Sequence, residues 1–463
     1  MAADDFQAMD PAAAALAAVA PVAPIPGHTL LVLLVQLAVL LLAARLLGAL
    51  ANRFGMPAVV GELTAGVLLG PSILAHLAPG VSRWLFPPAA VQLHLLDAVG
   101  QLGVLLLVGL AGTHVDVGHI RRNAGKAFTV SFGGLVIPLA FGVVAGLVMP
   151  VPLRPAETER PVFAMFLGIA ICVSAIPVIA KTLIELKLAH RNIGQLILTA
   201  GVIDDAVGWL MLSLVSAMAT NGLRGTTALG SLGWLAVVLI FTVMVGRPVV
   251  RYVMRRAASV ADTGVVTGAV VTLLLLSAAG THALKFEAIL GAFLCGILIG
   301  SCGADLSRLS ALNTVVMSVL APIFFATAGL RMDLTALAHW PLLFAALGVL
   351  GIAIVGKFLG AGLGGLASGL TRAECVALGA GMNARGVIEV IIAMVGLRLG
   401  VLGVEAYTVL ILVAIVTSLM APPILRRAMA GATVTEEEAQ RARKTMALTQ
   451  PTPETARPKR EAG

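Results

Sequence analysis

The sequence predicts an all-α membrane protein with about thirteen transmembrane helices, arranged as two inverted repeats. Three observations support this fold class. The chain of 463 residues is 59% hydrophobic and 12% charged, with a mean hydropathy of +1.01, whereas a soluble domain is about 45–50% apolar and about 25% charged. Apolar runs of about 20 residues, the length that crosses a bilayer, recur from Thr29 to Leu425. Two pairs of similar motifs also recur at a nearly constant separation.

Each expected span is an apolar run bounded by a short polar turn. The expected spans are 29–50, 58–77, 95–113, 127–149, 162–184, 193–218, 229–247, 264–282, 284–302, 313–331, 340–366, 374–397 and 406–425. Residues 1–28 form an N-terminal extension without the basic start of a signal peptide. Residues 428–463 are polar and charged, and we expect a disordered cytoplasmic tail there.

The distribution of basic residues between the loops predicts the orientation. With the N-terminus outside, thirteen basic residues fall on the cytoplasmic side: Arg53, Arg121, Arg122, Lys126, Lys181, Lys187, Arg191, Arg247, Arg251, Arg255, Arg256, Arg308 and Arg372. Seven fall on the outer side: Arg83, Arg154, Arg160, Arg224, Lys285, Arg331 and Arg398. Because cytoplasmic loops of membrane proteins carry the excess of Lys and Arg, this count favours an outer N-terminus and a cytoplasmic C-terminus.

Internal similarity predicts the repeat. The segment "GELTAGVLLG" (61–70) resembles "GAFLCGILIG" (291–300), and "LLLVGLAGTHVDV" (105–117) resembles "IFFATAGLRMDL" (323–334), at offsets of about 230 and 217 residues. An odd number of spans separates the matching helices, so the two copies cross the membrane in opposite senses. We therefore expect spans 1–6 and 8–13 to be inverted repeats, with 229–247 as a linker helix. This architecture is typical of secondary transporters, whose ion sites lie near the middle of the membrane.

Two adjacent acids, Asp204 and Asp205, lie near the centre of the expected span 193–218, in "LTAGVIDDAVGWLML". An ionised acid at that depth costs roughly 2.5–3.5 kcal/mol on insertion scales. A bound cation, a proton or a fixed positive charge must compensate it. Neighbouring residues on a helix point about 100° apart and need two separate partners, which disfavours a purely structural pairing. Lys357, deep inside the span 340–366, is a candidate partner, as a structural or a functional salt bridge.

Two further spans carry signals for a break in the helix. The span 162–184 contains Ser174 followed by Pro177, and its repeat mate 374–397 contains "GMNARGVIE", with Asn383, Arg385 and Glu389. Proline removes a helical hydrogen bond and invites an interruption. Two crossed broken helices would leave half-helix ends and unpaired carbonyls beside the two acids, the usual construction of a transporter ion site. Arg385 and Glu389, four residues apart, can pair along one helix face.

Other polar residues give weaker signals. Glu62, at the start of the span 58–77, is either a gate or interface residue or an acid at a helix start near the inner surface. The segment "GAGLGG" (360–365) matches GxGxxG but follows no strand, so we expect no dinucleotide site. The four cysteines and eight histidines have no metal-ligand spacing, and we expect no cofactor and no resident metal. The net charge of the chain is +8, and many of its Lys and Arg residues lie in short loops between the spans. This distribution follows from membrane orientation and does not predict nucleic-acid binding.

Five ordered motifs resemble the monovalent cation:proton antiporter family, in its Kef-type, bacterial sodium/proton and plant cation/proton exchanger branches. They are "RFGMPAVVGELTAGVLLGPSIL", "GVIDDAVGW", "APIFFATAGLRMDL", "GKFLG" and "GMNARGVIEVI". The resemblance covers residues 29–425. It implies the sodium/proton antiporter fold, a homodimer and a cell-membrane location. The dimerisation domain would comprise 29–113 and 264–331, and the ion-transporting core 127–218 and 340–425.

The resemblance also implies residue roles. Asp205 matches the ion- and proton-binding aspartate, Asp204 the neighbouring acid that pairs with the core lysine, and Lys357 that lysine. Both aspartates would then hold the transported metal cation. In "NARGVIE" the acid follows the arginine by four residues, which resembles the plant exchangers, several of which handle potassium, and leaves sodium preference open. No nucleotide-binding regulatory domain follows the last span, so we do not expect control by nucleotides.

The expected function is secondary active exchange of Na⁺, K⁺ or Li⁺ for protons by an elevator-like alternating-access mechanism, not enzymatic catalysis. Two close carboxylates and a lysine titrate as a unit, so cation and proton would compete for the same oxygens. The alternative is an ion-coupled carrier of an organic solute on the same scaffold. That carrier would need a larger polar cavity, and few polar side chains besides Ser174 and Asn383 are available to line one.

Overall fold

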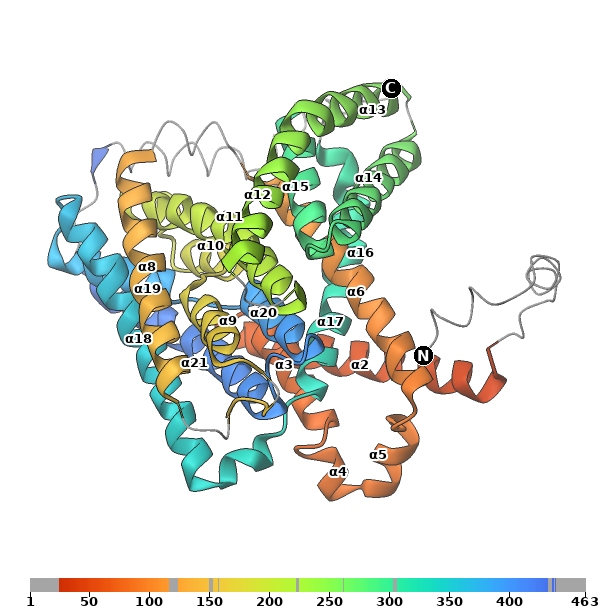
Figure 1. Ribbon diagram of the computed structural model, residues 1–463. Helices are drawn as coiled ribbons and strands as arrows, with labels where there is room; N and C mark the ends of the chain where they lie inside the picture. Colours follow the sequence, from red (N-terminus) through yellow and green to blue (C-terminus); the bar gives the residue numbers. More distant parts are fainter. Residues whose placement is uncertain are drawn as a thin grey trace, which may run out of the picture.

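The computed structural model describes residues 25–115, 124–149, 153–156, 158–221, 225–260, 262–302, 306–431, 435, 436 and 438. In these ranges all regular structure is helical (Figure 1). Ten helices are long and apolar enough to cross a membrane, and a pair bent by 45° adds an eleventh. Two shorter apolar helices, Arg160–Cys172 and Ala288–Ser301, lie in expected spans 5 and 9. Each of the thirteen expected runs therefore contains a helix.

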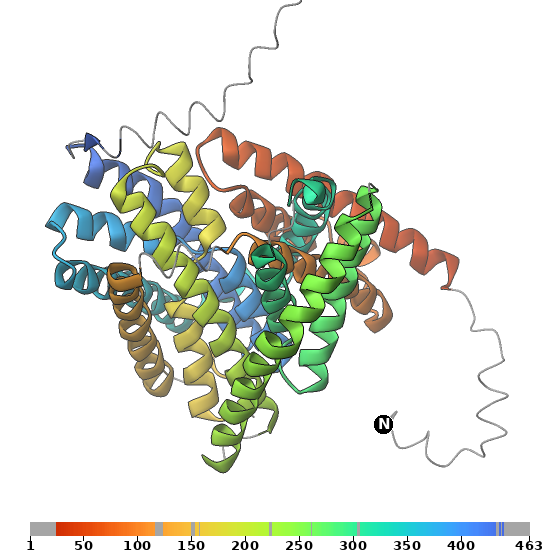
Figure 2. The same ribbon diagram turned by 90° about the horizontal axis from the view of Figure 1, so that it is seen from above.

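The helices pack into two groups that alternate along the chain. The scaffold group comprises α2 (Gly27–Arg53), α3 (Ala58–Leu69), α6 (Ala90–Thr113), α14 (Thr263–Ala283), α15 (Ala288–Ser301), α16 (Ser310–Val315) and α17 (Ala321–Leu330). The core group comprises α8 (Ala124–Val148), α9 (Arg160–Cys172), α10 (Ile176–Glu185), α11 (Asn192–Asn221), α18 (Trp340–Ala367), α19 (Arg372–Met382), α20 (Val387–Arg398) and α21 (Val404–Met429). In Figures 1 and 2, α8, α18 and α19 lie at one side of the molecule and α13 and α14 at the other.

Reciprocal packing of matching helices supports the predicted inverted repeats. In the scaffold group α3 packs on α17, and the matching pair α15 packs on α6. In the core group α8 packs on its repeat mate α18. Both scaffold contacts use glycines: Gly66 lies against Ala326 and Gly329, and Gly296 lies against the backbone around Gly109. Small residues let helix backbones approach closely where lipid provides no hydrophobic driving force for association.

Replacing Gly66 with alanine is expected to destabilise the scaffold group. An ideal Cβ at Gly66 would lie 2.0 Å from the carbonyl oxygen of Ala326, so the helices must move apart. Overpacking of this kind typically costs about 1–3 kcal/mol. Gly268→Ala on α14 is the matched control, because its Cβ would meet nothing within 4 Å and alanine favours a helix. Thermal unfolding in detergent should show a lower Tm for Gly66→Ala only; equal Tm values would contradict the close contact.

Two segments differ from the sequence expectations. The linker helix does not end at residue 247: α12 (Gly225–Phe241), a π-helical turn (Thr242–Gly246) and α13 (Arg247–Ala258) run on continuously. The expected span stops at residue 247 because the arginines of α13 interrupt the apolar run of the sequence. The opposite face of α13 is apolar and packs on α14 and α15, so the helix continues. The expected span 58–77 is confirmed as the candidate span Ala58–Leu77, which includes the short helix α4 (Leu74–Leu77). The next short helix, α5 (Pro79–Leu85), occupies a segment expected to be a loop.

The beginning of the expected tail contacts the core group. Helix α21 continues to Met429, and Glu438 is buried against the start of α11, where it accepts a hydrogen bond from the Asn192 N–H at 2.7 Å and lies 3.2 Å from Arg191. Burial alone would raise the pKa of Glu438, but the Asn192 and Thr435 hydrogen bonds and the Arg191 charge hold it below its usual value. Residues 432–434, 437 and 439–463 of the tail, and residues 1–24 of the N-terminal extension, lie outside the described residues.

Candidate ion-binding site

Two broken helices cross at the centre of the core group. One break separates α9 from α10 at Val173–Ala175, and the other separates α19 from α20 between Met382 and Val387. The two breaks contact each other directly, because the Ala175 N–H donates to the Ala384 carbonyl at 3.1 Å. Both breaks lie where Ser174 and Asn383 predict them. Pro177 falls inside the first turn of α10, a position where proline's missing N–H leaves no bond unmade.

Charged side chains compensate the exposed ends of the half-helices. The last carbonyls of α9 form a partial negative charge, and two cations donate to them. Lys357 donates to Cys172 O at 2.6 Å, and Arg385 donates to Ala170 O at 3.0 Å and to Ile171 O. The start of α20 carries a partial positive charge from its unpaired N–H groups. Glu389, in the first turn of α20, places a carboxylate beside this charge. The crossing is therefore stabilised by charged side chains at two of its half-helix ends, the end of α9 and the start of α20.

The ammonium group of Lys357 uses all of its hydrogen-bond donors. Its ammonium donates to Asp204 Oδ2 at 2.8 Å, to Gly134 O at 2.8 Å and to Cys172 O at 2.6 Å, so all three N–H groups have acceptors. Both side chains of the Lys357–Asp204 pair are 0% exposed. The pairing that the sequence indicates is thus present, in a setting where removal of either partner leaves a buried charge uncompensated.

Three side chains contact the carboxylate of Asp204. Besides Lys357, it accepts from Ser131 Oγ at 2.6 Å, and Ser174 Oγ lies 2.8 Å from its Oδ2. Ser174 is also 2.7 Å from Met382 O, at the end of α19, so it joins the two breaks to the acid. Sequence analysis missed Ser131, because one serine in an apolar span gives no signal of its own. Both carboxylate oxygens of Asp204 therefore have partners within the protein.

Asp205, one residue further on, is in a different environment. Its Oδ1 has no hydrogen-bond partner among the described residues, although the side chain is only 9% exposed. The start of α10 lies beside it, and the Ile176 backbone interacts with the carboxylate. A helix N-terminus and one unpaired carboxylate oxygen are suited to hold a small cation or a proton.

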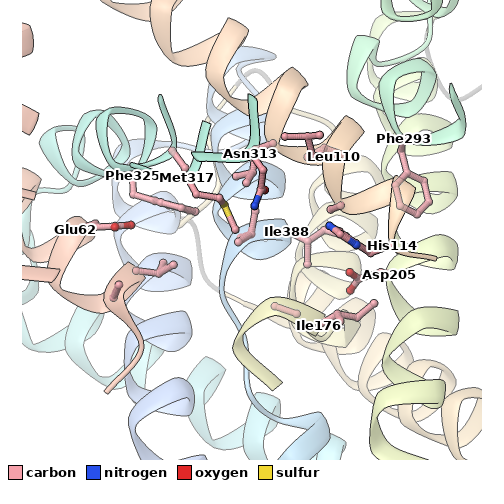
Figure 3. A pocket seen from close by; sticks show the side chains of 18 of the residues that line it. Glu62, Leu110, His114, Ile176, Asp205, Phe293, Asn313, Met317, Phe325 and Ile388 are labelled. Carbon is pink, nitrogen blue, oxygen red and sulfur yellow. The ribbon is translucent and has the colours of Figure 1, made fainter. Parts of the chain in front are cut away.

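A cavity of about 390 Å³ extends from Asp205 between the core and scaffold groups. Figure 3 shows Asp205 and His114 near one another on one wall and Glu62 on the opposite wall. His114 is at the end of α6, and sequence analysis missed it because a helix-end histidine is not distinctive. The other lining side chains are mostly apolar, among them Trp209, Phe293, Phe325 and Ile388. Glu62 therefore lies across the cavity from Asp205 and does not join the cluster around Asp204.

The remaining predicted residues brace the second break. Arg385 lies 3.3 Å from Glu389 across one helical turn, and both are 0% exposed. Ser418 on α21 donates to the Arg385 carbonyl. Asn383 is buried in the break, donates to Met420 Sδ at 3.6 Å, and its amide oxygen has no partner among the described residues. In the part of the chain that the structure describes, no group of three His, Cys, Asp or Glu side chains is arranged to hold a resident metal.

Comparison with known proteins identifies the family. Residues 38–431 match the transmembrane domain of the sodium/hydrogen exchangers. The chain is 33% identical over 406 residues to the Na⁺/H⁺ antiporter NhaS4 of Synechocystis, covering 86% of this chain and 97% of that protein. It is 27% identical to the Na⁺/H⁺-K⁺ antiporter GerN of Bacillus cereus, covering 84% and 95%. Cation/H⁺ antiporter 15 of Arabidopsis thaliana is 28% identical, but the match spans 47% of its length.

The fold also matches a solved structure. The sodium proton antiporter MjNhaP1 of Methanocaldococcus jannaschii superposes with a TM-score of 0.64 at 15% identity, covering 89% of this chain and 99% of that one. At this identity the match concerns the fold alone. Since the family match spans most of the chain and includes both broken helices, the chain belongs to the sodium/hydrogen exchanger family, the monovalent cation:proton antiporters, and is a membrane transporter rather than an enzyme.

Proposed function

We propose that this protein exchanges a monovalent cation for protons by letting the two compete for Asp205. One observation carries the proposal: of two adjacent buried acids, Asp204 is neutralised by Lys357, whereas Asp205 keeps an unpaired oxygen at the end of a cavity. A bare carboxylate is costly to move through a hydrophobic seal, so the core group crosses only after a cation or a proton neutralises it. The shared site couples the two fluxes.

The Asp204–Lys357 pair acts as the switch in this proposal. In the arrangement described here the pair is closed, and Asp205 alone is available to an ion. Protonation of Asp204 would remove the charge that holds Lys357 and change the charge of the whole cluster. A change of charge at Asp204 therefore acts on both Lys357, its ion-pair partner, and Asp205, its neighbour in the chain.

Alternating access requires the core group to move against the scaffold group, which we propose to be the dimerisation domain. The cavity opens beside the ends of α2 and α6, the cytoplasmic side if the N-terminus is outside. At the opposite side the groups are joined by Arg398 of α20 and Glu287 at the start of α15, 2.8 Å apart. A pocket of about 90 Å³, lined by Arg398, Asp97 and Arg331 among others, lies beside this ion pair. This arrangement supports an inward-open, outward-closed state of an elevator in the cell membrane.

Tethering Glu287 to Arg398 is expected to stop exchange. In the double variant Glu287→Cys/Arg398→Cys, a short bifunctional thiol reagent would fix the contact between the two groups, and a reducible linker would allow its release. We expect proton movement to fall to the background of empty vesicles and to return after reduction. Each single cysteine variant, treated identically, should remain active. Full activity of the tethered protein would contradict movement between the groups at this contact.

The transported cation is testable directly. Two of the relatives named above are antiporters for Na⁺, and the name of one of these two also includes K⁺. Everted membrane vesicles with an acid interior and a pH-sensitive dye, given sodium, potassium or lithium salts in turn, would identify the cation by the alkalinisation it causes. Absence of a response to every monovalent cation from about pH 6 to 9 would overturn the proposal. The mostly apolar cavity wall provides few groups for an organic solute.

A further inference from the structure

Helix α13 carries an exposed cluster of positive charge. Arg247, Arg251, Arg255 and Arg256 lie within its twelve residues, and all four are exposed. In the ranges that the structure describes, none of the four forms an ion pair with an acidic side chain. The orientation rule for basic residues explains why they lie on one side of the membrane, but not why they gather on a single ordered helix.

Packing of α13 on the scaffold group fixes which of its faces is exposed, and therefore where its arginines lie. Val250, Met254 and Ala257 are buried, and through this face α13 packs on α14 and α15 of the scaffold group. Arg247, Arg251 and Arg255 follow one another at intervals of four residues, so they form a row along the adjacent face. Cys302, at the end of α15, lies within electrostatic range of all three arginines.

Neighbouring residues fix the end of the row. Arg308 donates to the carbonyls of Ala258 and Val260 at 3.3 and 3.1 Å, so it completes the C-terminus of α13 and adds a positive charge there. Arg256 lies over the Tyr252 ring at 5.7 Å, and Tyr252 is 62% exposed. Exposed tyrosine beside arginine is typical of the level of lipid headgroups.

We propose that the row Arg247–Arg251–Arg255 is a binding site for the phosphate of an anionic phospholipid. Helix α13 is the arginine-rich end of the candidate span 233–258. Basic side chains at the end of a membrane span extend to the level of the headgroups. One guanidinium group can donate two parallel hydrogen bonds to a phosphate, which suits a row of arginines that have no carboxylate partner among the described residues. The preceding turn exposes Val243, Met244 and Val245, which an acyl chain would contact and a free phosphate ion would not.

Such a lipid would hold the linker to the scaffold side of the molecule. The continuous helix α12–α13 connects α11, which carries Asp204 and Asp205, to α14. The inference is independent of the ion carried, because it concerns binding at a surface far along the chain from the acids. Its test therefore uses lipid binding and thermal stability rather than transport.

The experiment measures lipid binding to the full-length protein in detergent. Phosphatidylglycerol and phosphatidylcholine are titrated separately, with binding followed by native mass spectrometry and by the Tm. We expect phosphatidylglycerol to bind and to raise the Tm, and phosphatidylcholine to do neither. The variant Arg247→Gln/Arg251→Gln/Arg255→Gln should bind phosphatidylglycerol roughly a hundredfold more weakly, since each basic residue at an anionic surface contributes roughly fivefold.

Two further variants make the result specific. Arg372→Gln/Arg426→Gln/Arg427→Gln removes three exposed arginines elsewhere and should bind like the unchanged protein. Arg247→Lys/Arg251→Lys/Arg255→Lys keeps the charge but loses the paired hydrogen bonds, and should bind with intermediate affinity. Equal binding by the glutamine variant and the unchanged protein would overturn the proposal, as would equal effects of the two lipids. A Tm increase produced equally by inorganic phosphate would overturn the assignment to a lipid.

Discussion

Asp205→Asn is expected to abolish cation-dependent proton movement while the protein remains folded. Asparagine has nearly the same size but can neither bind a proton at neutral pH nor present a negative charge to a cation. Because Oδ1 of Asp205 has no partner among the described residues, the substitution leaves no buried charge behind. We expect exchange in everted vesicles to fall on the order of a hundredfold or more, the range for loss of a proton-transferring group.

The control for this experiment is Asp262→Asn. Asp262 is exposed and caps α14 through a hydrogen bond from the Gly264 N–H at 2.8 Å, which asparagine preserves equally well. Its exchange rate should match that of the unchanged protein. Retained exchange in Asp205→Asn at comparable expression would contradict the assignment of Asp205 as the carrier. In that case Asp204, after opening of its ion pair, would be the next candidate.

Lys357→Met should cause the largest loss of stability. The substitution leaves the Asp204 carboxylate and the carbonyls of Gly134 and Cys172 without their shared donor, inside a region that is 0% exposed. Breaking a buried ion pair by removing one partner costs about 3–5 kcal/mol. Thermal unfolding in detergent should show a Tm well below that of the unchanged protein.

The double variant Asp204→Asn/Lys357→Met separates charge from packing. With both charges removed no uncompensated carboxylate remains, so we expect the Tm to recover most of the loss caused by Lys357→Met. Lys126→Met, at an exposed position of α8, should leave the Tm unchanged. A double variant no more stable than Lys357→Met would mean that the lysine acts through its shape rather than through its charge.

The elements of the fold that depend on local sequence could be predicted. Apolar runs locate the helices because crossing a bilayer requires a continuous apolar stretch. The two breaks could also be predicted from local sequence, because Ser174 with Pro177 and Asn383 in "GMNARGVIE" are polar or helix-breaking residues inside apolar runs. Helix α13 could not be predicted in the same way. Its arginines end the apolar run, and the helix continues because Val250, Met254 and Ala257 find a surface on the scaffold group.

The difference between Asp204 and Asp205 could not be predicted from their positions. They are adjacent in an apolar helix, and which one faces Lys357 depends on the rotation of α11 against α8 and α18. The family resemblance implies the assignment, and the contacts support it through a physical distinction: one acid has three partners, the other an unpaired oxygen. Glu287 precedes α15 and Arg398 ends α20, 111 residues apart, so no local pattern could predict their contact.

The compensating charges around the site all belong to the core group. Lys357, Asp204, Arg385 and Glu389 lie on α18, α11 and the second broken helix, and they would travel with Asp205 if that group moves as one body. The local electric field at Asp205 would then be nearly the same on either side of the membrane. A cation would have similar affinity from both faces, and such an exchanger runs in either direction, with the net flux set by the two ion gradients rather than by the protein.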